Sequence, residues 1–362
     1  MTTLTSKERL KRCYFHEELD RPAVYIRCYI RNGSDRSYDK LLDLINEKTD
    51  LKIDSGVPLK MYDFKELEEK HDEDFKRKKT IIKTPLGELF SSNLIGLRGQ
   101  PGYTEKHLLD SKEDIDKYLS LKFNKAEGDL TEYLRAKEKM GDRGIVTAAI
   151  SSNPAALTVD LFGSERFAMM TLTDRELLHE LTKKHFDFLM ELAKFYIEKG
   201  VGPFFWMSGE EYITPILHGP QDFDDFNVKY DKPIIDLIHN AGGRVHIHCH
   251  GSIKKVLPGF LKMGVDVLHP FEAPPMGDVT PSEAKEIAGD KICFEGNIQI
   301  ADMYEKDTAN IKKQVEGLIR DMFKDKKNLI ICPTASPYII GEGGKCYENY
   351  RTMIETVLNY GK

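Results

Sequence analysis

Long apolar stretches are missing from this 362-residue chain, which contains no run of 18 apolar residues. A transmembrane helix needs such a run, so we expect no membrane partner. The first fifteen residues, MTTLTSKERLKRCYF, also lack the apolar core of a signal peptide. These two absences predict a cytoplasmic protein.

An excess of positive charge is missing as well. The chain has 53 Lys and Arg against 59 Asp and Glu, which gives a net charge of −6. Because the charges are spread along the chain and form no basic face, we expect no nucleic-acid partner. One dense cluster, KHDEDFKRKK at 70–79, is interpreted as a solvated helix end or linker.

Cysteine is sparse and scattered, with six residues over the whole length. This spacing does not resemble a disulfide framework, so in a reducing compartment the cysteines should be free thiols or metal ligands. We expect a structural role for Cys13, Cys28, Cys293 and Cys346.

Short apolar segments that alternate with amphipathic ones are abundant. The apolar segments lack a polar face, which is typical of a parallel sheet covered on both sides. They lie near Ala23, Lys52, Ile145, Phe204, His246, Val267, Cys293 and Ile330. Eight such strands predict an α/β fold, a (β/α)8 TIM barrel that spans 1–362 as a single domain. An open doubly wound sheet is the alternative, but no glycine-rich fingerprint follows the first strand.

Two segments depart from this alternation. Residues 6–15 are expected to form a helix before the first strand. The segment TIIKTPLGELFSSNLIG alternates around a Pro-Leu-Gly turn, so we expect a hairpin insertion at about 79–98. The predicted barrel therefore carries an N-terminal helical and hairpin excursion. A separate expectation concerns Pro258, which should interrupt the helix that follows residue 252.

The most unusual stretch is GGRVHIHCHGSI at 242–253. Three of the eleven histidines and one cysteine lie within five residues: His246, His248, Cys249 and His250. Side chains alternate between the two faces of a strand, so the histidines share one direction and Cys249 takes the other. If the histidines face the barrel axis, His246 is a packed, hydrogen-bonded core residue. His248 and His250 then lie at the rim, where both can bind one ion.

Polar residues also end the neighbouring strands, where TIM barrels carry their active sites. They are Arg27, Arg31, Glu210, Glu211, His269, Glu272, Glu295, Asn297 and Cys332. Histidine, glutamate and cysteine on adjacent strand ends predict a metal site. We expect His248, His250 and Glu272 as its ligands, while Cys332 is either a fourth ligand or a small core residue.

Several motifs resemble the uroporphyrinogen decarboxylase-like superfamily over nearly the whole chain. They include HEELDRPAVYIR, VDLFGS, GGRVHIHCHG, GVDVLHPFEAPP and FEGNI. The resemblance implies a (β/α)8 barrel and one of two activities. One branch contains decarboxylases, and the other contains zinc-dependent methyltransferases that work with a corrinoid protein.

The methyltransferase branch matches better. The arginine-rich motif of the decarboxylases is reduced to RCYIR, which keeps only Arg27 and Arg31, and their late histidine is absent from CPTAS. The His-x-Cys-Gly motif of the methyltransferases aligns with 248–251, where His250 replaces the cysteine. Glu272 matches the family glutamate. The late cysteine of the family falls at Ala335, with Cys332 three residues earlier.

The change from cysteine to histidine implies a harder zinc site that is a better Lewis acid for oxygen. We therefore expect an O-demethylating methyltransferase that takes a methyl group from a methoxylated aromatic compound to the cobalt of a corrinoid protein. Three alternatives stay open: a methylcobalamin:thiol methyltransferase, a decarboxylase-like lyase and a metal-free binding protein. A homodimer is also left open.

Further roles follow for residues around the expected metal. Glu210 or Glu211 is expected to donate a proton to the leaving oxygen or to bind the metal, and Asn297 to orient the substrate. Trp206 and Tyr212 are candidates for aromatic pocket walls. Arg27 and Arg31 either hold a substrate carboxylate or pair with acids of the barrel.

Overall fold

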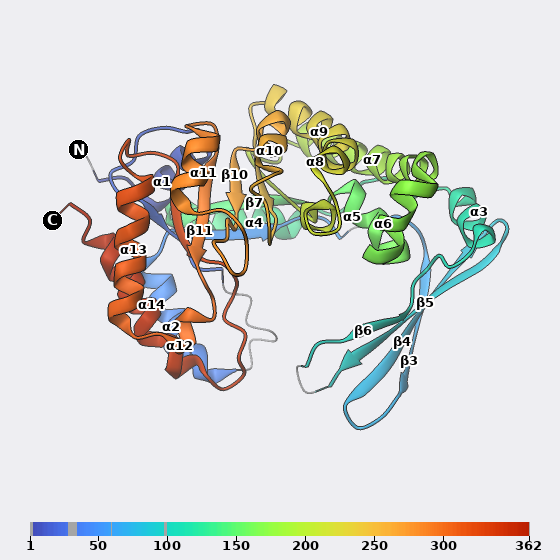
Figure 1. Ribbon diagram of the computed structural model, residues 1–362, viewed down its shortest axis with the longest axis horizontal. Coiled ribbons are helices and arrows are strands. Elements are labelled where there is room, and N and C mark those ends of the chain that lie inside the picture. Colours follow the sequence, from blue (N-terminus) through green and yellow to red (C-terminus); the bar gives the residue numbers. More distant parts are fainter. Residues whose placement is uncertain (1–2, 28–34, 59, 98–99, 362) are drawn as a thin grey trace.

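Eight parallel strands form a barrel (Figure 1). The computed structural model describes residues 3–27, 35–58, 60–97 and 100–361. The strands follow the order β1-β12-β11-β10-β9-β8-β7-β2. Their bounds are β1 Ala23–Val24, β2 Leu51–Ser55, β7 Gly144–Ser152, β8 Phe204–Ser208, β9 Arg244–His248, β10 Val267–His269, β11 Cys293–Ile298 and β12 Leu329–Pro333. Each predicted strand position lies within one of them, so the predicted TIM-barrel fold is confirmed.

Helices cover the outside of the barrel, and most of them bury their apolar faces on the strands, while the apolar residues of 164–173 belong to a second cluster. The helices are α1 Ser6–Tyr14, α2 Asp39–Lys48, α4 Thr131–Met140, α5 Pro154–Phe162, α6 Ser164–Thr173, α7 Arg175–Glu198, α8 Pro220–Phe223, α9 Lys229–Asn240, α10 Leu257–Met263, α11 Pro281–Ala288, α12 Asp302–Glu305, α13 Thr308–Met322 and α14 Gly343–Leu358. Among the described residues, none of the helices is both long and apolar enough to cross a membrane.

The expected interruption at Pro258 is wrong. The helix α10 begins at Leu257, so Pro258 lies in its first turn. A backbone N–H in the first turn of a helix has no partner within the helix, so its absence in proline costs nothing there. The proline therefore starts this helix.

An antiparallel sheet extends away from the barrel between β2 and β7 (Figure 1). It contains β3 Phe64–Lys70, β4 Phe75–Thr84, β5 Gly87–Gly96 and β6 Tyr103–Lys106, and α3 Lys112–Ser120 follows it. We call this sheet the arm. Strands β4 and β5 pair around the expected turn, and β3 and β6 extend the sheet beyond the limits of 79–98.

The charge-dense segment 70–79 is neither a helix end nor a linker. It includes the end of β3, a turn and the first half of β4. Its basic side chains pair across the two strands with glutamates of β3: Lys76 with Glu68 at 2.8 Å and Lys78 with Glu66 at 2.6 Å. Both pairs are diagonal across the two strands, because Lys78 is directly opposite Glu68 and Lys76 is directly opposite Lys70. Diagonal neighbours on one face of a sheet are within reach of long charged side chains. The charge pattern therefore reflects a solvated hairpin.

Asp50 joins the two ends of the barrel sheet. Its backbone N–H donates to the carbonyl oxygen of Val24 at 2.8 Å, and its carboxylate accepts the Val24 N–H at 2.9 Å. The buried carboxylate also accepts hydrogen bonds from Arg9 at 2.6 Å and from Arg21 at 3.0 Å. Two guanidinium groups thus compensate one buried carboxylate where β1 meets β2.

We predict that Asp50→Asn destabilises the protein by about 3–5 kcal/mol, because it leaves the buried Arg9 without its full counter-charge. Urea unfolding followed by circular dichroism measures the change. Asp142→Asn is the matched control, since Asp142 is exposed and only 3.6 Å from the exposed Lys7. An Asp50→Asn midpoint equal to that of the control would show that the cluster does not hold the barrel closed.

Candidate active site

The histidines of β9 lie inside the barrel, and Cys249 points away from them. Cys249 is fully buried in the hydrophobic core together with Ile247, as strand alternation predicts. His246 is 2% exposed and is the deepest of the three. Neither of its ring nitrogens has a hydrogen-bond partner among the described residues, so the expected hydrogen bonds of His246 are not found. Its Nε2 lies 3.6 Å from the Glu295 carboxylate.

His248, His250 and Glu272 meet at the carboxyl ends of β9 and β10, and we call them the rim group. The rings of His248 and His250 lie edge to face, with centroids 4.7 Å apart. The Nδ1 of His250 lies 3.1 Å from a carboxylate oxygen of Glu272, and the Gly251 N–H donates to the same oxygen at 2.9 Å. Burial acts to raise the pKa of Glu272, but these hydrogen bonds lower it below its usual value.

A second set of donors lies deeper in the barrel. His269, Glu295 and Cys332 have ligand atoms that all lie within 4.8 Å of one another, and each residue is at most 1% exposed. We call these residues the buried trio. The sequence identified Cys332 as a ligand candidate, but it gave His269 and Glu295 only as strand-end residues. His248 links the two groups, because its Nδ1 lies 2.9 Å from the Nδ1 of His269.

Two cationic side chains, Lys52 and Arg27, lower the pKa values of three imidazoles. These are His246, His248 and His269, which we call the histidine column. Lys52 of β2 pairs with Glu295 at 2.5 Å, and both side chains are buried. Arg27 donates to His248 Nδ1 at 2.8 Å. Burial is the main cause that lowers the pKa of His246 and His269, and Lys52 and Arg27 lower it further. The same causes lower the pKa of His248 to about 2. These imidazoles are therefore neutral, as metal ligands must be.

The two groups differ in how well they would serve as a catalytic metal site. Two imidazoles and a carboxylate form the donor set of known catalytic zinc sites, which keep one position open for water or substrate. The His250 side chain is 40% exposed, so such a position at the rim group is accessible. In the buried trio, Lys52 already neutralises Glu295, and burial raises the pKa of the Cys332 thiol. Among the described residues, the buried trio is the only group of three such donors whose ligand atoms all lie within 4.8 Å of one another, whereas the rim group is the more accessible of the two.

Glu210 and Glu211 follow β8 in a short 3-10 helix, η4 Glu210–Ile213, and face different surroundings. Glu210 is fully buried beside Asp231 of α9. Burial and this second carboxyl raise its pKa well above its usual value. Burial also raises the pKa of Glu211, while charges on His250 and Arg27 act in the opposite direction. Of these two carboxyls, Glu211 is the one whose pKa responds to the charge of His250.

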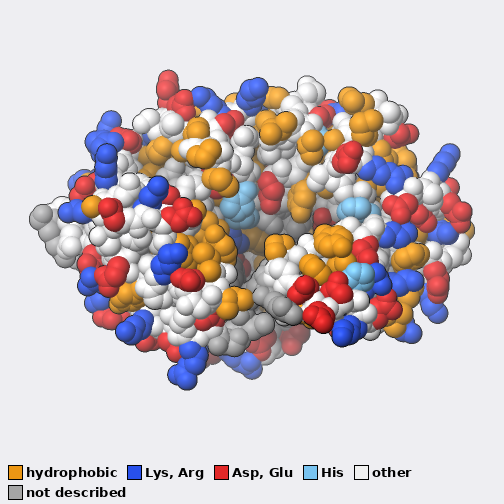
Figure 2. Space-filling view, turned by 60° about the horizontal axis from the view of Figure 1, so that its bottom comes forward, with side chains coloured by type: hydrophobic (Ala, Val, Ile, Leu, Met, Phe, Trp, Pro, Cys, Tyr) orange, Lys and Arg blue, Asp and Glu red, His pale blue; other side chains and the backbone are white. Residues whose placement is uncertain are grey.

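The remaining predicted site residues surround this centre. The Arg27 guanidinium lies 6.0 Å from the centre of the Trp206 ring, while Tyr212 is 37% exposed. Asn297 of β11 is paired in register with Cys332 of β12. Arg31 lies outside the described residues. On the face in Figure 2 the surface is hollowed at its centre, and histidine, acidic and hydrophobic side chains border the hollow.

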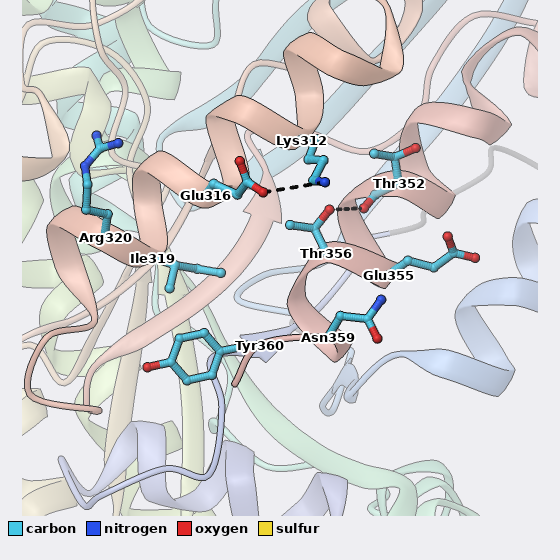
Figure 3. A pocket seen from close by; sticks show the side chains of 9 residues that line it. All are labelled: Lys312, Glu316, Ile319, Arg320, Thr352, Glu355, Thr356, Asn359 and Tyr360. Carbon is cyan, nitrogen blue, oxygen red and sulfur yellow. Dashed lines mark hydrogen bonds and ion pairs between the residues drawn. The ribbon is translucent and has the colours of Figure 1, made fainter. Parts of the chain in front are cut away.

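A separate groove of about 500 Å³ lies between α13 and α14 (Figure 3). Charged side chains of both helices line it, including Lys312, Glu316 and Glu355. Lys312 and Glu316 lie 3.8 Å apart and pair with each other. The groove lies on the outer helical layer, so it is not part of the site at the strand ends.

Comparisons with known proteins agree with this architecture. A family model described as uroporphyrinogen decarboxylase (URO-D) matches residues 92–341. A methyltransferase from Methanosarcina mazei shares the fold with a TM-score of 0.65 and 13% identity, over 99% of this chain and 100% of that chain. A B12-independent methionine synthase from Shewanella sp. W3-18-1 gives a TM-score of 0.48 and 12% identity, over 77% and 74% of the two chains. No curated protein matches the sequence.

The neutral histidine column predicts a loss of stability in acid. An imidazole whose folded pKa lies below its unfolded value of about 6.5 contributes stability above that pH and loses it as the pH falls. We expect the free energy of unfolding of the chelator-treated protein to fall steadily as the pH drops below about 6.5. His246→Gln should reduce the slope by about 1.4 kcal/mol per pH unit below about pH 6.5. Urea titrations at each pH measure it, and an unchanged slope in the variant would contradict a neutral His246.

Proposed function

We propose that this chain, which belongs to the uroporphyrinogen decarboxylase family, is a zinc-dependent methyltransferase. It takes a methyl group from a small methoxylated aromatic compound and passes it to the cobalt of a partner corrinoid protein. The observation that carries this proposal is the rim group of two imidazoles and one carboxylate at the barrel mouth. The fold shared with the Methanosarcina mazei methyltransferase over the full chain supports it.

Decarboxylation of a substrate with many carboxylates fits this site less well. Such a substrate needs several cationic side chains that are not already paired. Among the described residues, Arg27 contacts His248, and Lys52, inside the barrel, is bound to Glu295. This distribution of charge favours a substrate with few negative groups.

In the proposed reaction, His248, His250 and Glu272 hold the zinc ion. Zinc would act as a Lewis acid on the ether oxygen of the substrate. Glu211 donates a proton to the leaving oxygen, a role that the rise of its pKa by burial favours. Trp206 forms an aromatic wall beside Arg27. Asn297 orients the substrate from the adjacent end of β11.

The first test measures metal content. Purified wild-type protein should hold about one zinc ion per chain, and His250→Ala should bind zinc at least about tenfold more weakly. Cys249→Ala is the matched control, because its side chain is adjacent in sequence but buried on the other face. Metal analysis by mass spectrometry after competition with a chelator measures both.

Three results of this experiment count against parts of the proposal. Wild-type protein without zinc contradicts the metal centre as a whole. Full zinc content in His250→Ala contradicts the rim ligands. If Cys332→Ala loses zinc and His250→Ala retains it, zinc binds to the buried trio and not to the rim group.

The second test measures methyl transfer, followed by the absorbance of cobalt with methoxybenzoates and a reduced corrinoid protein. Glu211→Gln should lower kcat by about 100-fold or more, because the leaving oxygen loses its proton donor. Glu210→Gln should keep most activity, since Glu210 faces Asp231 instead of the rim group. Equal losses in both variants would contradict the assignment of Glu211. Demethylation of the methylated corrinoid by a thiol, without any reaction of ethers, would favour the thiol methyltransferase.

A further inference from the structure

A second pocket lies where the arm meets the barrel, and its residues do not overlap with the site at the strand ends. Its volume is about 350 Å³, within the range of small-molecule sites. Strands β4, β5 and β6 form one wall, and the helices α3, α5 and α7 contribute to the other. We call it the arm pocket.

The arm supplies short, uncharged polar side chains. Thr80 of β4 is directly opposite Ser91 of β5, and Asn93 of β5 is opposite Thr104 of β6. Residues at directly opposite positions share one face of a sheet, so these four side chains face the pocket together. The Thr104 hydroxyl donates to Asn93 Oδ1 at 2.9 Å. This wall offers hydrogen-bond donors and acceptors but no net charge.

The barrel wall is aromatic and held in place by hydrogen bonds. The Tyr62 and Tyr118 rings meet edge to face at 6.1 Å. The Tyr118 hydroxyl lies 2.7 Å from His185 Nε2, and His185 Nδ1 lies 3.0 Å from the Thr158 hydroxyl. Burial lowers the pKa of His185 to about 3, so this ring is neutral. This aromatic part of the wall is therefore uncharged.

Asp160 of α5 gives the pocket its charge preference. It is the one acidic residue in the lining, which contains no lysine or arginine. Asp160 is an exposed residue that lines the pocket; partial burial raises the pKa of its carboxyl, and the charge of His107, another lining residue, acts in the opposite direction. An anionic ligand would meet this carboxylate with the His107 imidazole beside it but without a lysine or arginine in the lining to compensate it. An ammonium group would instead pair with Asp160, and the Tyr62 ring can contact its alkyl groups.

We propose that the arm pocket binds a small organic cation that carries a hydroxyl group. The ammonium group lies at Asp160, and the hydroxyl group bonds to the polar side chains of the arm. This site does not depend on the proposed zinc centre, because none of its residues belongs to the rim group or the buried trio.

Calorimetric titration with choline and with ethanolamine tests the proposal in the full-length protein. Both compounds should bind saturably to the wild-type protein. Asp160→Asn should weaken choline binding at least about tenfold. Asp116→Asn, which removes the same charge from an exposed position of α3, should leave binding unchanged. The neutral isostere of choline, with carbon in place of the ammonium nitrogen, should bind wild-type protein more weakly than choline.

Thr80→Arg tests the location, because it places bulk and positive charge on the arm wall and should abolish choline binding. Two results would overturn the proposal: no saturable binding of either cation, or wild-type affinity for choline in Asp160→Asn. Wild-type affinity in Thr80→Arg would equally overturn it, since the cation would then bind elsewhere. Zinc content should be unchanged in all these variants, so failure here is distinguishable from failure of the metal centre.

Discussion

The positive charge inside the barrel is the constraint on which the candidate site depends. Lys52 pairs with Glu295 across the barrel, and Arg27 contacts His248. Taking a carboxylate out of water is costly, so Glu295 requires a partner as close as Lys52. The same cations disfavour a proton on any nearby imidazole. His246, His248 and His269 therefore stay neutral beside one another, which protonated rings could not do without strong repulsion.

The backbone of the barrel brings these groups together. Parallel register pairs His269 of β10 with His248 of β9, so the two imidazoles stack with centroids 5.0 Å apart. Closure through Asp50 places β2, which carries Lys52, beside β1. Because a closed barrel has no edge strand, every strand end contributes to one common mouth. The geometry of the site is thus a consequence of register and closure.

Periodicity made the eight strands and the histidine face of β9 predictable, since a buried parallel strand has few other interpretations. Alternation also separated Cys249 from its histidine neighbours correctly. The sequence could not show that Lys52 meets Glu295, because 243 positions separate them and only closure brings them together. It also concealed β3, whose residues are all exposed and mostly charged, so its pattern resembles a loop. Whether His250 and Glu272 bind zinc stays a prediction.

The rim group and the buried trio differ in how far their side chains are exposed to solvent. The buried trio offers nitrogen, oxygen and sulfur, and each of its residues is at most 1% exposed. The rim group offers two imidazoles and a carboxylate, with an exposed ring, His250, next to the buried carboxylate of Glu272. Histidine at this position also leaves more positive charge on a bound zinc ion than a thiolate would. In the proposed transfer the cobalt attacks the methyl carbon, and that charge would stabilise the ether oxygen as it leaves. Burial raises the pKa of Glu211, which favours the protonated carboxyl that the leaving oxygen needs as a proton donor.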